Sequence, residues 1–353
     1  MSSITLDSSG TFEAKINPEL NLSAPPYVFN LVSFFTLVKE NTKIQNLVFL
    51  EDGRFVVSWK KWDIYNDDEL KDKSEFRVYD PSNNFHVDIT VTFPDEEYMV
   101  NIINVDSNTL IVSTFIETQK ESNSDLTKFT LYYKVIKLSK DTYTMNSYTI
   151  QENVIEDNIH YYLNKINNKK AFASLSPGGM INIWSAEEPL KTTPIETIDF
   201  KEGNYSKCYN QKGNRLVLYW DNKMRIIDLN SYKLIKTIEN QDFTCSLLRD
   251  FDEKKIIVKN YSSERETLSF FDFDTEKLEK IENIKMKNCQ GLMALRDGNL
   301  LLQCDKNKFI VYDVKNGKWS MSIWHDNKFQ DFYKINEQSF ATVDSNSIYI
   351  WKY

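Results

Sequence analysis

The fold is decided by the stretch Leu295-Arg-Asp-Gly-Asn-Leu-Leu-Leu-Gln-Cys304 and by its continuation Phe309-Ile-Val-Tyr-Asp313. An Asp-Gly turn precedes a short apolar run, and a second apolar run ends in an aromatic residue and an aspartate. Short apolar runs separated by turns of this kind are typical of β-hairpins. The same phrase returns as Gly213-Asn-Arg-Leu-Val-Leu-Tyr219 followed by Met224-Arg-Ile-Ile-Asp228, so it is a repeat.

The phrase occurs seven times, and we number these copies one to seven. The middle of the first apolar run in each copy lies at Val56, Ile111, Phe172, Val217, Ile257, Leu301 and Ala341. The last five of these positions are 45, 40, 44 and 40 residues apart. A four-stranded propeller blade takes about 40–45 residues. In copy six we expect strands at 292–295, 299–303, 309–313 and 319–323, and we expect helix to be minor throughout the chain.

The second apolar run of each copy ends at Tyr79, Ile136, Trp184, Ile227, Phe271, Tyr312 and Trp351. Four of these residues are followed by aspartate, in Tyr79-Asp80, Ile227-Asp228, Phe271-Asp272 and Tyr312-Asp313. This pattern resembles the WD-repeat β-propeller family, whose third strand ends in Trp-Asp or a close variant. Lysine or serine takes the place of the aspartate in the other three copies, and the family's Gly-His dipeptide before the first strand is missing. The resemblance covers about residues 40–353.

The repeat and the resemblance together imply an all-β fold, namely one seven-bladed β-propeller of four-stranded antiparallel blades. We expect a single domain over residues 1–353, with seven repeats in 41–353 and an N-terminal segment in 1–40. Copy seven reaches Tyr353 directly after its third strand, so its outer strand has to come from elsewhere. The apolar stretch Tyr27–Val38 is the expected donor, which would close the ring and cover an aggregation-prone edge. A partner-binding or membrane-surface helix over the same stretch stays open as an alternative.

Composition narrows the class of protein. The net charge is −8 and lysines and arginines alternate with acids, which argues against binding of a nucleic-acid backbone. We find no signal peptide and no apolar run near the ~20 residues that a membrane span needs, so we expect a cytoplasmic protein, with nuclear or cytoskeletal association left open. The four cysteines form no CxxC pair, and we interpret them as free, mostly buried thiols: Cys208, Cys245, Cys289 and Cys304.

Motifs that carry chemistry are missing from the sequence. It contains no nucleophile elbow, zinc-binding helix, phosphate-binding loop or dinucleotide fingerprint. The segment Ser176-Pro-Gly-Gly179 is interpreted as a turn, and His86 and His160 as structural residues. His325-Asp326 lies on an expected loop, where a histidine seldom has a catalytic role. We therefore predict no catalytic residue, no cofactor and no metal site.

The family resemblance implies a non-catalytic protein–protein interaction scaffold, which presents loops on its faces as a subunit or adaptor of a multiprotein assembly. We expect one or more protein partners, no nucleic acid, no membrane insertion, and a monomeric propeller inside a larger complex. The alternative is an enzyme or small-ligand-binding propeller, with acids or His325 converging on a central channel.

Extra sequence in copies one and two indicates where a partner could bind. The surplus lies between the expected second and third strands, in Lys60–Ser74 and in Glu117–Lys128. Both connections would emerge on one face as neighbouring loops. The first contains Trp62, Ile64 and Tyr65 among charged residues, a composition typical of interface anchors, so these three are the predicted partner-binding residues. A pair of tolerated insertions without function is the competing interpretation.

Overall fold

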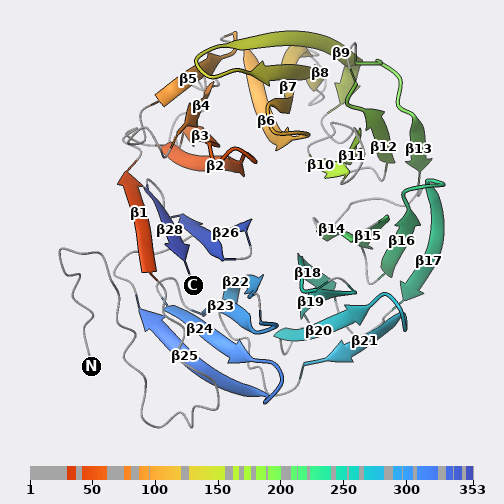
Figure 1. Cartoon of the computed structure of the whole chain (residues 1–353). Helices are drawn as coiled ribbons and strands as arrows, with labels where there is room; N and C mark the ends of the chain where they lie inside the picture. The colour runs from red at the N-terminus through yellow and green to blue at the C-terminus, as the bar shows by residue number, and fades with distance from the viewer. Residues whose placement is uncertain are drawn as a thin grey trace. The chain divides into compact units, whose positions relative to one another are not determined.

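The computed structural model describes the residues that build the repeats. They are residues 30–36, 42–61, 75–80, 87–94, 96–120, 127–155, 162–166, 171–175, 180–187, 190–199, 208–212, 214–220, 223–239, 244–252, 254–261, 266–281, 289–295, 297–304, 308–324, 331–336, 338–343 and 347–352. All regular elements in these ranges are β-strands, paired antiparallel in small sheets (Figure 1). The prediction of an all-β, antiparallel fold is confirmed. None of these described residues forms a helix able to cross a membrane.

The chain falls into two compact units, and the unit of residues Glu40–Tyr205 holds the sheets of copies one to three. Strands follow one another in sequence order within each sheet. Copy one has β2 (Thr42–Phe49), β3 (Phe55–Lys61), β4 (Glu75–Tyr79) and β5 (Val87–Thr92). Copy two has β6 (Glu97–Asn104), β7 (Thr109–Lys120), β8 (Thr127–Leu138) and β9 (Tyr143–Ile155). Copy three has β10 (Tyr162–Ile166), β11 (Ala171–Leu175), β12 (Met180–Ser185) and β13 (Glu196–Asp199).

The second unit combines Met1–Lys39 with Ser206–Tyr353 and holds the sheets of copies four to seven. Copy four has β14 (Cys208–Lys212), β15 (Arg215–Trp220), β16 (Lys223–Asp228) and β17 (Lys233–Glu239). Copy five has β18 (Thr244–Asp250), β19 (Lys255–Tyr261), β20 (Glu266–Asp272) and β21 (Lys277–Lys280). Copy six has β22 (Cys289–Ala294), β23 (Leu300–Cys304), β24 (Lys308–Asp313) and β25 (Lys318–Trp324). Copy seven has β26 (Asp331–Asn336), β27 (Ser339–Val343), β28 (Ser347–Lys352) and β1 (Asn30–Thr36).

The second strand of each copy forms the core. In β11 and β27 all five residues are buried, although successive side chains point to opposite faces of a sheet. The sequence of a strand that is buried on both faces is a continuous apolar run, and this pattern identified the repeat. Each of these sheets is therefore covered on both of its faces.

The sheet of copy seven takes its fourth strand from far away in the chain. Its order is β1-β28-β27-β26, and β1 pairs antiparallel with β28 from Asn30 opposite Lys352 to Thr36 opposite Ser347. The expected donor stretch Tyr27–Val38 thus contains a strand that pairs with the third strand of the last copy. The pairing covers the edge that copy seven would otherwise leave open.

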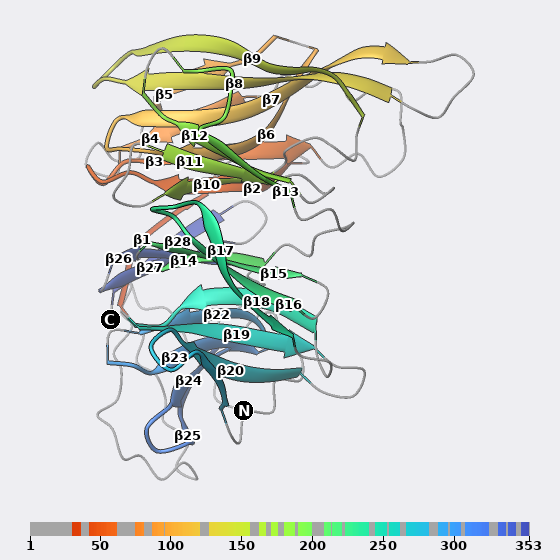
Figure 2. The ribbon, with the colours of Figure 1, turned by 90° about the vertical axis from the view of Figure 1, so that its right-hand side faces the viewer.

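In copy two, most of the segment that was predicted as a loop forms strand. Residues Glu117–Lys128 were predicted as a connection, but β7 runs on to Lys120 and β8 begins at Thr127. The two strands pair from Glu117 opposite Phe129 to Lys120 opposite Thr127, with one irregularity at Thr118. Only 121–126, between these strands, lie outside the described residues. The stretch is mostly polar and its residues that favour strands are Thr118 and Thr127, so main-chain pairing rather than apolar packing extends the hairpin. Figure 2 shows the long strands of this sheet.

Two tryptophans at the ends of third strands pack between sheets. Trp351 is 1% exposed, donates its indole N–H to the Thr342 hydroxyl at 2.9 Å, and meets Phe309 of the copy-six sheet edge-on at 6.4 Å. Trp184 repeats the arrangement: it donates to Ser174 at 2.8 Å and meets Tyr133 of the copy-two sheet. Tyr79 and Tyr312, which end the third strands of copies one and six, are also buried.

Removing β1 is expected to destabilise copy seven. Deletion of residues 1–40 uncovers the edge of β28, and an open strand edge pairs readily with other chains. We expect a lower melting temperature, faster proteolysis and aggregation, measured beside a control that lacks only residues 1–29 and keeps β1. A soluble 1–40 deletion with an unchanged melting temperature would show that β1 contributes little.

Trp351→Ala is expected to cost about 3–5 kcal/mol of unfolding free energy, as for other buried aromatic residues truncated to alanine. Trp351→Phe keeps most of the ring packing and loses only the hydrogen bond to Thr342. It should therefore cost much less, in the range of about 0.5–1.5 kcal/mol. Urea denaturation measures both variants. An alanine variant of normal stability that fails to bind a partner would contradict the packing role.

Candidate interaction surface

Two sets of turns lie at the same end of each sheet. The first turn joins the first and second strands of a copy, and the third turn joins its third and fourth strands. Main-chain hydrogen bonds connect the two: Leu229 N–H donates to the Asn214 carbonyl at 2.7 Å in copy four, and Phe273 N–H donates to the Lys254 carbonyl at 3.0 Å in copy five. We call this end of the sheets the turn face.

Acidic or amide side chains fix the first turns. In copy one the Asp52 carboxylate accepts the N–H of Arg54 at 3.0 Å, and in copy two Asp106 accepts the N–H of Thr109 at 2.7 Å. In copies five, six and seven a side-chain oxygen likewise accepts the N–H of a residue two or three positions further on. These side chains belong to Asp252, Asp297 and Asn336. Aspartate and asparagine favour such turns because their side chains imitate the main chain.

The aspartates that end third strands fix the third turns. Asp228 accepts the N–H of Asn230 at 3.0 Å, Asp272 that of Thr275 at 2.9 Å, and Asp313 that of Asn316 at 3.0 Å. Each turn then needs one residue in the left-handed region. Gly317 supplies it in copy six with φ 62°, whereas Tyr232 and Glu276 hold φ 55° in copies four and five. Residues other than glycine are uncommon there.

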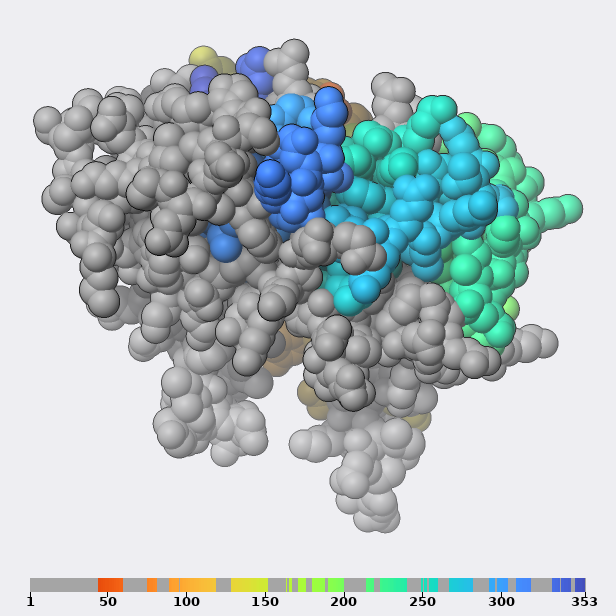
Figure 3. Space-filling model, turned by 90° about the horizontal axis from the view of Figure 1, so that it is seen from below, coloured from red at the N-terminus to blue at the C-terminus, as the bar shows by residue number. Residues whose placement is uncertain are grey.

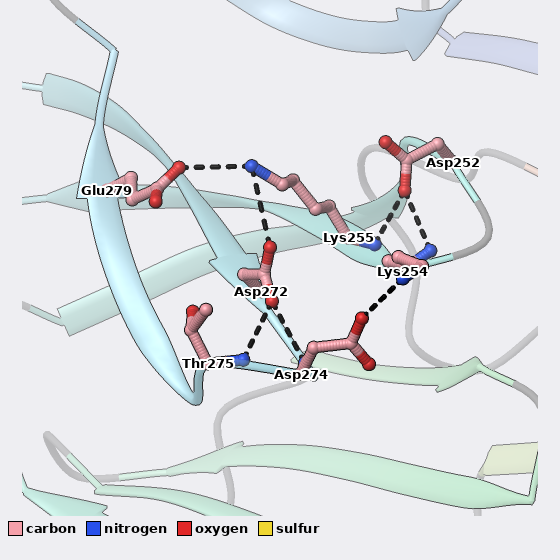
Figure 4. A network of polar contacts seen from close by, with 7 residues as sticks. All are labelled: Asp252, Lys254, Lys255, Asp272, Asp274, Thr275 and Glu279. Carbon is pink, nitrogen blue, oxygen red and sulfur yellow. Dashed lines mark hydrogen bonds and ion pairs between the residues drawn. The ribbon is translucent and has the colours of Figure 1, made fainter.

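Copy five combines both turns in a charged network (Figure 4). Lys254 of the first turn binds Asp274 of the third turn at 2.6 Å. Lys255 lies between Glu279 at 3.1 Å and Asp272 at 3.5 Å. Asp252 accepts the main-chain N–H groups of both lysines at 2.7 Å, so the network contains four carboxylates and two ammonium groups and carries an excess of negative charge.

The network sets the protonation of its members. The N–H of Thr275 holds the pKa of Asp272 below its ordinary value, and the N–H of Asp274 and the Lys255 charge act in the same direction. Hydrogen bonds to Asp274 and Glu279 raise the pKa values of Lys254 and Lys255. All of these shifts favour the charged forms. Figure 3 shows the surface around residues 254–281, in cyan, beside β16 and β17, in green.

Arginines join the turns of adjacent sheets. Arg54 is 9% exposed, bonds Asp52 in its own turn at 2.8 Å, and donates to the Ser139 carbonyl in the third turn of copy two at 2.9 Å. Arg215 occupies the same place in copy four and donates to the Phe273 carbonyl of copy five at 2.9 Å. A bonded turn on one sheet thus supports the turn on the next.

A buried ion pair crosses the sheet of copy two away from the turn face. Glu97 of β6 pairs with Lys134 of β8 at 2.9 Å, and their side chains are 2% and 7% exposed. Thr114 of β7 donates its hydroxyl to Glu97, and Lys134 donates to Ser147 of β9 at 3.4 Å. Four strands are linked by this polar row. Removing one partner of such a pair leaves a buried charge and commonly costs about 3–5 kcal/mol.

The predicted partner-binding residues Trp62, Ile64 and Tyr65 lie outside the described residues, as do His86, His160 and His325. The four cysteines lie in β14, β18, β22 and β23, and the structure does not describe their side chains. Sequence reasoning missed the turn face, although the signal was present. Asp or Asn precedes the second strand in five copies, at Asp52, Asp106, Asp252, Asp297 and Asn336.

Comparison with known proteins relates the chain to others by fold. No protein-family model and no curated protein matches its sequence. Solved structures do match, among them a chain in "Crystal Structure of Mitotic Checkpoint Complex", which is 11% identical with a TM-score of 0.61. The likeness covers 96% of this chain and 99% of that chain. At this identity the likeness concerns the fold alone, which in this chain is a set of four-stranded antiparallel sheets.

The capping aspartates make stability depend on pH. Partial burial opposes ionisation of Asp313, but the hydrogen bonds from Asn316 outweigh it, so the pKa of Asp313 is lowered like that of Asp272. A group whose folded-state pKa is depressed stabilises the fold above its unfolded pKa, and this stability is lost as the pH falls through the folded pKa. We therefore expect the melting temperature to fall steeply below about pH 4.

The double variant Asp272→Asn/Asp313→Asn tests this dependence, because asparagine can still accept the turn hydrogen bonds without a charge. We expect a lower melting temperature at pH 7 and a flatter decline in acid. Asp274→Asn is the matched control, since its ion pair with Lys254 is exposed and exposed pairs contribute little. An acid profile identical to that of the wild type in the double variant would rule out these two aspartates as the cause.

Proposed function

We propose that this chain is a non-catalytic interaction scaffold: one seven-bladed β-propeller, closed by β1, which binds protein partners as part of a larger assembly in the cytoplasm. The repeated four-stranded sheets support the proposal, as does a fold likeness that spans nearly the whole chain. The matched chain belongs to a structure of a complex, which is consistent with protein partners.

The observation that carries the proposal is the construction of the turn face. Its turns recur from copy to copy and are held by the same main-chain and aspartate hydrogen bonds. Arg54 and Arg215 then tie neighbouring turns together. Turns bonded in this way hold the strands of each sheet in place at one end, so the connections at the other end start from fixed strands, which lowers the entropy lost on binding.

The partner is proposed to dock at the other end of the sheets, where the second and third strands are joined. The connection 62–74 of copy one offers Trp62, Ile64 and Tyr65 between charged residues. Large aromatic side chains framed by polar ones dominate the binding energy of many interfaces. In this arrangement the turn face is the rigid base and the opposite connections are the contact surface.

Affinity purification from the native source, followed by quantitative mass spectrometry, tests the proposal. We expect a partner at a stoichiometric level with the wild-type chain. Replacing 62–74 by Asn-Gly is expected to reduce its recovery at least about tenfold, the loss expected when hot-spot side chains are removed. Lys61 then connects through a short hairpin turn to Glu75.

The matched control replaces 121–126 by the same Asn-Gly turn. Lys120 and Thr127 are already paired, so a two-residue turn closes this hairpin without loss of the sheet. We expect full partner recovery with the control. Equal recovery with the 62–74 replacement would exclude the first connection as the binding site, and lack of any stoichiometric partner of the wild type would contradict the scaffold role.

A further inference from the structure

The third turn of copy six contains a dipeptide that occurs nowhere else in the sequence, Asn316-Gly317. The turn joins β24 and β25, and in it Asn316 is exposed and Gly317 is half-buried. Asparagine is a thermolabile residue, most of all when glycine follows it. Glycine has no side chain that would keep its main-chain nitrogen away from the asparagine amide carbon. The exposed turn thus presents the most reactive asparagine sequence of the chain to solvent.

Asn316 also has a structural task in this turn. It is the third residue after Asp313, whose carboxylate accepts the main-chain N–H of Asn316 at 3.0 Å and its side-chain N–H at 2.7 Å. In copy four Ser231 stands at the same place and donates its hydroxyl to Asp228 at 2.8 Å. In both turns this position supplies a side-chain donor to the capping carboxylate. Hydrogen bonds to an ionised acceptor are about twice as strong as bonds between neutral groups.

The third turn of copy six has a longer link to its first turn than the corresponding turns of copies four and five have. Val314 N–H donates to the side-chain oxygen of Asn299 at 3.3 Å. The corresponding N–H groups of Leu229 and Phe273 donate to main-chain carbonyls at 2.7 and 3.0 Å. A bond that exceeds the usual 2.7–3.2 Å is weak. The bonds within the turn, to the capping carboxylate, therefore carry more of its stability in copy six.

We propose that Asn316 is a modification site, at which spontaneous deamidation replaces a hydrogen-bond donor by a carboxylate and loosens the third turn of copy six. The main-chain nitrogen of Gly317 gives its proton to a solvent base and attacks Cγ of Asn316. The new N–Cγ bond closes a succinimide ring, the bond from Cγ to Nδ2 breaks, and the nitrogen leaves with a proton from solvent as ammonia. Water then adds to either ring carbonyl and opens the ring, which leaves aspartate or isoaspartate at this position.

The reaction reverses the electrostatics of the turn. Nδ2 of Asn316 lies 2.7 Å from Oδ2 of Asp313, so an oxygen in its place brings two negative charges together. In the isoaspartate product the main chain passes through the former side chain and is one atom longer. The connection between the paired residues Asp313 and Lys318 then no longer has its original length. This inference goes beyond the scaffold role and does not depend on it.

Peptide mapping by mass spectrometry of the folded chain, stored in mildly alkaline buffer, measures the reaction. We expect aspartate and isoaspartate to accumulate at position 316. Gly317→Glu introduces the residue that holds the same place in copy five, where Glu276 has φ 55°, so the turn accepts it. Its side chain obstructs the attack and should slow the reaction at least about tenfold, which corresponds to an added barrier of about 1.4 kcal/mol.

Two further variants measure the consequence for the turn. Asn316→Asp has the sequence of the aspartate product and should lower the melting temperature by about 2–4 °C. Asn316→Ser is the matched control, because serine keeps a donor for Asp313, as Ser231 does for Asp228. It should melt as the wild type does and show no reaction at this position.

The wild-type chain unfolded in guanidinium chloride sets the reference rate. A folded chain that keeps Asn316 intact over the time in which the unfolded chain is fully deamidated there would overturn the proposal. So would an Asn316→Asp variant that melts like the wild type, and a Gly317→Glu variant that reacts at the wild-type rate would overturn the attack by Gly317. All of these measurements use the purified chain, so their failure leaves the scaffold proposal to its own test of partner recovery.

Discussion

The double burial of the second strand is the constraint on which the structure depends. Residues such as Val56, Val217 and Ile257 have no exposed surface, and their neighbours on both sides of the strand are buried as well. A single sheet cannot satisfy such a strand, because its two faces need two covering layers. Repetition of the unit is therefore a physical requirement, since each sheet supplies one of the layers that the next sheet needs. The third-strand aromatic residues Trp184 and Trp351 fill the space between these layers.

Burial on both faces leaves the strand ends as the place for polar groups, and the turns show how these groups are satisfied. Aspartates bond the main chain of their own turns, while Arg54 and Arg215 carry the bonding to the next sheet. Copy two is the exception, because Glu97 and Lys134 place an ion pair inside the sheet and extend it to Ser147. The same sheet has the longest strands. Its departures from the common pattern thus occur together.

The sequence predicted strands best where apolar runs are bounded by turns. In copy six, β23 and β24 lie within one residue of the expected 299–303 and 309–313, a difference typical of strand ends. The first strand, β22, begins three residues earlier than expected, because Gly291 interrupts the apolar run and the pairing is irregular there. The hairpin of β7 and β8 was taken for a loop because its outer half is polar. Hydrogen-bond pairing continues regardless of polarity, which a search for apolar runs cannot detect. The predicted contact residues Trp62, Ile64 and Tyr65 lie outside the described residues, so they stay a prediction.

The pairing of β1 with β28 has a consequence for the time course of biosynthesis. Asn30 meets Lys352, so more than 300 residues are translated between the two strands. At about 5–20 residues per second, a ribosome needs roughly 15–65 seconds to cover that distance. During this interval the sheets of copies one to six can each form from neighbouring strands, while β1 has no acceptor. The synthesis of β28 thus determines when β1 enters a sheet, and until then β1 is an unpaired apolar segment of the nascent chain.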